Sequence, residues 1–105
     1  MESVRDILLQ HIADPPSIAE LAIKVGLNQQ KLMTGFRFLN GITIYKYLKE
    51  LRMKRAAELL QQTDLSIGEI AAAVGYHGDG HFQKAFRDVH GVTPHSLRTE
   101  LKLPE

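Results

Sequence analysis

The segment Ser17–Gly26 reads SIAELAIKVG, and Ser66–Gly75 reads SIGEIAAAVG. Six of the ten positions are identical at a shift of 49 residues. Each copy begins with Ser-Ile-x-Glu, a pattern in which the serine and glutamate side chains cap the backbone N–H groups of a helix start. Each copy ends in glycine, which is favoured where a helix stops in a left-handed conformation. The two segments therefore predict the same short helix twice.

The repeat continues beyond these segments after one extra residue in the second copy. A repeated pattern of this length indicates a duplicated structural unit, and two copies are too few for a solenoid. The pairs that correspond at a shift of 50 residues are Leu32 and Phe82, Phe36 and Phe86, Arg37 and Arg87, Leu39 and Val89, Gly41 and Gly91, and Thr43 and Thr93.

Helix signals surround both copies. Val4, Ile7, Leu8 and Ile12 are spaced as on one helix face, and Asp14-Pro15-Pro16 stops that helix. We predict an all-α fold of about seven helices, in two tandem helix-turn-helix lobes of three helices each, joined by a long linking helix. The other predicted elements are a helix from Ser17 to about Lys24, one capped by Asn28 that ends at Asn40-Gly41, the linking helix from Thr43 to about Gln62, and a last helix opening at Thr93-Pro94. The predicted lobes cover about residues 1–42 and 63–105, with the linking helix over 43–62.

The composition excludes several classes of protein. The 105 residues contain no cysteine, so disulfides, thiolate nucleophiles and cysteine-ligated zinc are impossible. That usage fits a reducing cytoplasm, and neither a secretion signal nor a membrane-length apolar run is present. No paired carboxylates, nucleophile-base pair or phosphate-binding glycine loop appears, so we expect no enzyme and no cofactor. A net charge of only +1 means that any nucleic-acid surface depends on uneven placement of the basic residues.

Each unit combines a short helix, a tight turn with glycine and a second helix, which is the helix-turn-helix arrangement. The second helix is expected to bury one stripe and to expose the opposite face, free to enter a DNA major groove. The expected buried stripes are Leu32, Gly35, Phe36 and Leu39 in the first unit and Phe82, Ala85, Phe86 and Val89 in the second. The candidate DNA-binding residues are Gln29, Gln30, Met33, Thr34, Arg37, Asp79, Gly80, His81, Gln83, Lys84 and Arg87.

The tandem units, the linking helix and the second copy through Gly91-Val92-Thr93-Pro94 resemble the AraC/XylS family of bacterial transcription regulators, over about residues 3–101. The resemblance implies that two recognition helices bind successive major-groove segments of double-stranded DNA. It implies phosphate contacts for Arg37 and Arg87. The positions that it places against the bases are Gln30, Met33, Thr34, Gly80, Gln83 and Lys84.

The chain departs from the family pattern at two positions. Gly80 has no side chain where relatives commonly carry a polar one, so the second unit is expected to read DNA less specifically. Phe38 stands where a basic residue is common, and it either packs under the linking helix or marks a partner surface. Family members usually carry a separate sensor domain that binds an effector ligand, so this chain is expected to be a fragment lacking that domain.

Other interpretations of single features remain open. The basic stretch from Lys46 to Arg55 is either a solvated face, the reading we favour, or a phosphate track. His77 and His81 have a metal-ligand spacing, but no third ligand is evident, so we expect no metal. A helix-turn-helix also occurs in protein-interaction modules, so docking on RNA polymerase is the alternative to DNA binding and is compatible with it.

Overall fold

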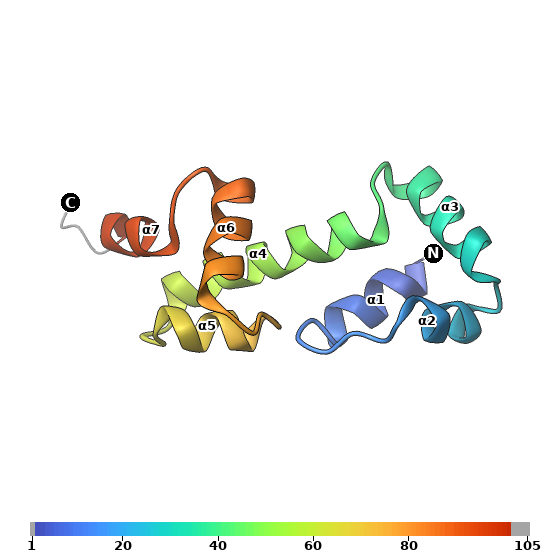
Figure 1. The fold of residues 1–105 in the computed structure, drawn as a ribbon, viewed down its shortest axis with the longest axis horizontal. Coiled ribbons are helices and arrows are strands. Elements are labelled where there is room, and N and C mark those ends of the chain that lie inside the picture. The colour runs from blue at the N-terminus through green and yellow to red at the C-terminus, as the bar shows by residue number, and fades with distance from the viewer. Residues whose placement is uncertain (1, 102–105) are drawn as a thin grey trace. The chain divides into compact units, whose positions relative to one another are not determined.

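The computed structural model describes residues 2–101, which form seven α-helices and no strand (Figure 1). The all-α prediction is therefore confirmed. The helices are α1 (Glu2–Gln10), α2 (Ile18–Val25), α3 (Gln29–Asn40), α4 (Ile44–Gln62), α5 (Ile67–Ala73), α6 (Asp79–His90) and α7 (Pro94–Leu101).

The chain divides into two compact units inside the long helix α4, between Lys49 and Glu50. Unit 1 comprises residues 1–49 and unit 2 residues 50–105. Each unit contains one helix-turn-helix pair, formed by α2 and α3 in unit 1 and by α5 and α6 in unit 2. The first turns of α4 thus belong to unit 1 and the rest of this helix to unit 2.

Both repeated helices start with the capping box that the sequence predicts. Glu20 N donates to Ser17 Oγ over 3.1 Å, and Ser17 N donates to Glu20 Oε1 over 3.0 Å. The same reciprocal pair joins Ser66 and Glu69 at 3.0 and 2.9 Å. These bonds satisfy N–H groups that a helix start leaves without a partner.

The glycines of the repeat end helices or complete turns with positive φ. Gly26 lies at φ 72° after α2, and Gly75 at φ 96° after α5. A side chain in this left-handed region clashes with the backbone, so glycine is the residue that allows the chain to turn there.

The core of unit 1 is formed by the inner faces of its helices. Phe36 of α3 is fully buried, and its ring meets Tyr47 of α4 edge-on with centroids 5.4 Å apart. The buried residues of this unit are Val4, Leu8, Leu21, Ala22, Leu32, Phe36 and Ile44.

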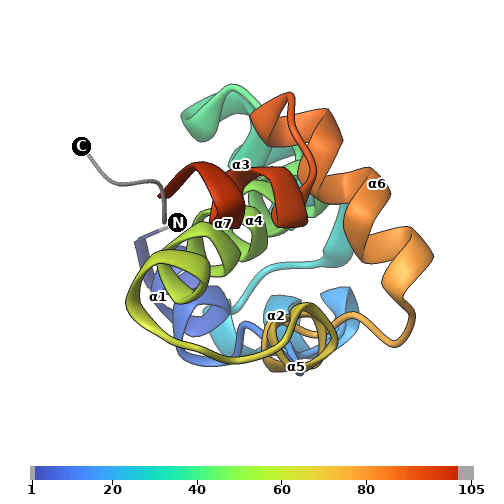
Figure 2. The same cartoon turned by 90° about the vertical axis from the view of Figure 1, so that its left-hand side faces the viewer.

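In unit 2, helices α5, α6 and α7 gather around the C-terminal part of α4 (Figure 2). Phe82 and Phe86 of α6 are fully buried, with ring centroids 5.9 Å apart. The buried residues that pack with them are Met53, Ala56, Leu60, Ile70, Ala71, Val74 and Ala85. Leucine, isoleucine, alanine and phenylalanine thus build a core without tryptophan.

Two residues of the predicted buried stripes are exposed instead. Leu39 is 63% exposed and Val89 is 38% exposed, so this part of the prediction is wrong. Both lie in the last turn of their helix. Helices that cross at an angle touch over only a short length, so a residue with the right periodicity still lies outside the contact when it is near a helix end.

Arg98 of α7 holds the end of α4 and the loop after it. Its guanidinium donates to the carbonyl of Leu65 and, over 3.3 Å, to that of Thr63. The two terminal nitrogens of Arg98 are therefore occupied by carbonyls of the loop between α4 and α5, which leaves the side chain unavailable to phosphates.

We therefore expect Arg98→Ala to destabilise unit 2 by about 1.5–3 kcal/mol, the range for hydrogen bonds made by a charged group. Denaturant unfolding of the two proteins measures this difference. An unchanged midpoint for Arg98→Ala would show that these bonds contribute nothing to stability.

The capping boxes also make the folding stability of the chain depend on pH. The hydrogen bond from the backbone N–H of Ser17, and then the hydroxyl of Ser17, lower the pKa of Glu20 below its usual range, and Ser66 acts in the same way on Glu69. A lowered pKa in the folded chain gives a contribution that is present above the unfolded pKa and is lost as pH falls through the folded pKa.

We expect thermal melting temperatures to fall as the pH is lowered from 5 to 3, and to fall less in the double variant Glu20→Gln/Glu69→Gln. Glutamine keeps the capping geometry but does not titrate. Glu100→Gln on α7 is the matched control, because Glu100 is exposed and belongs to neither box. Equal slopes in all three proteins would contradict the assignment.

Candidate nucleic-acid interface

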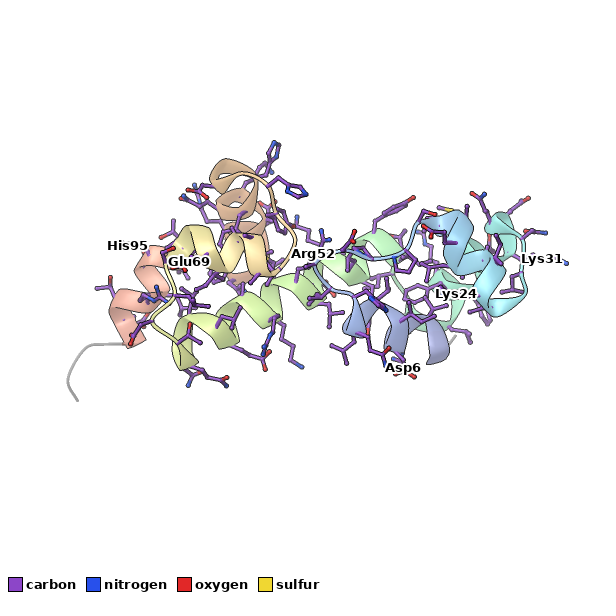
Figure 3. The ribbon with its side chains drawn as sticks, turned by 90° about the horizontal axis from the view of Figure 1, so that it is seen from below. Asp6, Lys24, Lys31, Arg52, Glu69 and His95 are labelled. Carbon is purple, nitrogen blue, oxygen red and sulfur yellow. The ribbon has the colours of Figure 1, made fainter. Side chains whose placement is uncertain are left out.

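Helix α3 presents a polar outer face in unit 1. Asn28 caps the helix by accepting a hydrogen bond from Lys31 N over 2.8 Å, and Figure 3 shows the Lys31 side chain pointing away from the helix. A shallow hollow on this face is bordered by Gln30 and Thr34, among other residues. All five residues that the sequence nominated on α3 are exposed, namely Gln29, Gln30, Met33, Thr34 and Arg37.

Helix α6 presents the corresponding face in unit 2. It starts after Gly78, which has no side chain to cap the helix. Gly80 faces open space, since a Cβ added there would meet nothing within 4 Å. A second hollow is bordered by Gly80, Gln83, Lys84 and Arg87. The six residues nominated on α6 are all exposed, namely Asp79, Gly80, His81, Gln83, Lys84 and Arg87.

The two outer faces differ in charge. Helix α3 carries Lys31 and Arg37 and no carboxylate. Helix α6 carries two cations and two aspartates, and Lys84 Nζ lies 3.2 Å from Asp88 Oδ2. With neutral histidines, the charges of α6 cancel while α3 is positive.

The basic residues of α4 are partly engaged within unit 2. The Arg52 guanidinium lies over the Tyr76 ring, 5.5 Å from its centroid, and Arg55 forms an ion pair with Glu58 at 4.0 Å. Arg52 is labelled in Figure 3. These contacts favour the reading of this stretch as a packed and solvated face.

The structure shows the exposure or contacts of three residues that the sequence did not reveal. Phe38 is 86% exposed, so it does not pack under the linking helix. His90 has Nε2 2.9 Å from the Met53 carbonyl, and its ring centroid lies 4.5 Å from that of Phe86. Asp88 was overlooked, although its place four residues after Lys84 on one helix is the sequence signal for the ion pair.

Metal and membrane features are absent from residues 2–101. His77 and His81 are exposed, and no group of three or more potential ligands gathers within this range. No helix of the described chain combines the length and apolarity needed to cross a bilayer.

Two units that each pair a short helix with an exposed, polar second helix define a helix-turn-helix protein. A family model described as a helix-turn-helix domain matches residues 21–100. A transcriptional regulator from Chromobacterium violaceum, described as containing an AraC-type DNA-binding domain, is 32% identical with a TM-score of 0.90, over 99% of this chain and 93% of that one. The C-terminal domain of AraT, a response regulator from Geobacillus stearothermophilus, is 30% identical with a TM-score of 0.90, over 99% of this chain and 87% of that one.

The chain belongs to the AraC-type helix-turn-helix family of transcription regulators. The Msm operon regulatory protein of Streptococcus mutans is 30% identical over 97% of this chain, which corresponds to 37% of that relative's length. The resemblance seen in the sequence is confirmed. Relatives of this kind are regulators rather than enzymes.

Proposed function

We propose that this chain is the DNA-binding part of a bacterial transcription regulator, with α3 and α6 as its two recognition helices. The observation that carries the proposal is the division of each helix into an apolar face, buried in its own unit, and an outer face whose nominated residues are all exposed. The similar proteins support it, because they are described as transcriptional regulators and DNA-binding domains.

The proposed mechanism divides the contacts by their chemistry. Arg37 and Arg87 occupy equivalent repeat positions and would bind phosphates, which fixes the register without reading the sequence. Gln30, Thr34 and Lys84 would reach base edges in the major groove, where each base pair offers a distinct set of donors and acceptors. Gly80 contributes no side chain, which brings the backbone of α6 closer to the bases.

The direct experiment uses this chain to select the duplexes that it binds from a pool with roughly 20 randomised base pairs. That length is enough for two major-groove segments one helical turn apart. Because both helices lie on one chain, the selected site should be two unrelated segments rather than a palindrome, and a monomer should suffice. Failure of the chain to enrich any duplex would overturn the proposed function.

Variants should separate the two kinds of contact. Lys84→Ala is expected to remove one base preference, at a cost on the order of 1–3 kcal/mol, with a smaller loss for Thr34→Ala because the hydroxyl offers a single bond. Arg37→Ala and Arg87→Ala should weaken all duplexes alike and reduce the salt slope by about one each. Titration of selected and scrambled duplexes at two salt concentrations measures this. If Lys84→Ala weakens both duplexes equally, Lys84 is a phosphate contact.

A protein partner is a second candidate function, and Phe38 and Leu39 favour it because they expose 86% and 63% of their surface side by side in sequence. RNA polymerase is the partner we propose for an activator of this kind. Loss of transcriptional activation by Phe38→Ser with unchanged DNA affinity would support this surface. We place effector binding outside these residues, because the chain spans 37% of the Msm regulator and 27% of GbdR from Pseudomonas aeruginosa.

A further inference from the structure

The carboxylate of Asp88 lies on the helix that would enter the groove. Asp79 has an ordinary explanation, since an acidic residue in the first turn stabilises a helix. Asp88 is in the last turn, three residues before the cap Gly91, where a negative charge opposes the helix dipole. The helix dipole therefore does not account for Asp88, and a phosphate-lined groove would repel its charge.

One partner of Asp88 is a proposed base-reading residue. Asp88 Oδ2 lies 3.2 Å from Lys84 Nζ, and the two side chains are 43% and 77% exposed. Both residues border the hollow on the outer face of α6. The equivalent positions of α3 are Thr34 and Phe38, so the first unit has no such pair.

We propose that Asp88 is a specificity-determining residue of α6, an inference that rests on the DNA-binding function proposed above. On arbitrary DNA, the carboxylate retains Lys84 and repels phosphate, which lowers affinity. An exposed ion pair of this kind is weak and opens easily. A G·C pair can give both side chains a new partner when the ion pair opens, since guanine offers O6 and N7 to lysine and cytosine offers its amino group to aspartate. The positive helix α3 then supplies more of the attraction, and the Lys84–Asp88 pair gives α6 a selectivity that Gly80 does not provide.

Asp88→Asn is the test variant, and it should fold, because it removes a charge that the helix dipole disfavours. At about 0.1 M salt it should bind the unselected duplex pool about tenfold more tightly, the effect of one additional effective phosphate contact. Its selected sites should lose the G·C preference in the α6 segment and keep the α3 segment. Asp88→Glu, which keeps the carboxylate, should match the unmodified chain both in its affinity for the pool and in its G·C preference.

Asp6→Asn is the matched control, since it changes the net charge equally from an exposed position on α1, where Figure 3 shows Asp6 pointing outward. In a Lys84→Gln background, Asp88→Asn should change the sequence preference much less, because the carboxylate and Lys84 read the two bases of one pair together. The inference would be overturned if Asp88→Asn raised the affinity only as much as Asp6→Asn and left the base preference unchanged. It would also be overturned if the effects of Asp88→Asn and Lys84→Gln on the base preference were fully additive. Failure of the unmodified chain to enrich any duplex would instead contradict the proposed function itself.

Discussion

A tenfold rise in salt concentration is expected to weaken binding of this chain to duplex DNA by roughly 4000-fold, because a slope of about −0.9 per phosphate and roughly four neutralised phosphates give a value near −3.6. Counting Arg98 and one cation of the linking helix as well would give about six phosphates and a slope near −5. The structure removes Arg98 from that set, since its guanidinium is bound to backbone carbonyls. The exposed cations that remain at the recognition helices are Lys31, Arg37, Lys84 and Arg87.

Titration of one selected duplex over a series of salt concentrations measures the slope. Arg98→Ala should leave it unchanged, whereas Arg37→Ala should make it shallower by about one. Binding that does not respond to salt would mean that phosphates are not contacted, and would favour a protein partner.

Phe86→Ala is expected to destabilise unit 2 by about 3–5 kcal/mol, the usual cost of removing a large aromatic side chain from a core. The Phe86 ring is fully buried and lies against both Phe82 and His90, with centroids 5.9 and 4.5 Å away. Because small domains are stable by only about 5–15 kcal/mol, this loss removes a large share of the unit's stability.

Phe38→Ala is the matched control for that measurement, since Phe38 belongs to the equivalent helix of unit 1 but is 86% exposed. Its free energy of unfolding should change by less than about 0.5 kcal/mol. Urea unfolding followed by circular dichroism compares the variants. A similar loss of stability in both would contradict the assignment of Phe38 to the surface.

The features that the sequence predicted well depend on local chemistry. Ser17 with Glu20 and Ser66 with Glu69 form a cap within four residues of chain, so the pattern alone specifies the contact. The internal repeat likewise predicts both helices α3 and α6 and their exposed outer faces. The exposure of residues such as Gln30 and Lys84 follows from helix periodicity.

The features that the sequence missed depend on how helices meet in space. Leu39 and Val89 have the periodicity of core residues but lie beyond the helix contacts. Arg98 looks like a surface cation until α7 brings it to carbonyls 33 and 35 residues earlier in the chain. His90 likewise reaches the Met53 carbonyl across 37 residues. No short-range pattern encodes these separations.

The most direct test of the proposed interface is a titration of the isotope-labelled chain with a selected duplex, followed by amide chemical shifts. The account predicts that the largest changes fall on the outer faces of α3 and α6, from Gln29 to Arg37 and from Asp79 to Asp88, with small changes in α1. Large changes confined to α1 or α7, with the amides of α3 and α6 unmoved, would contradict it.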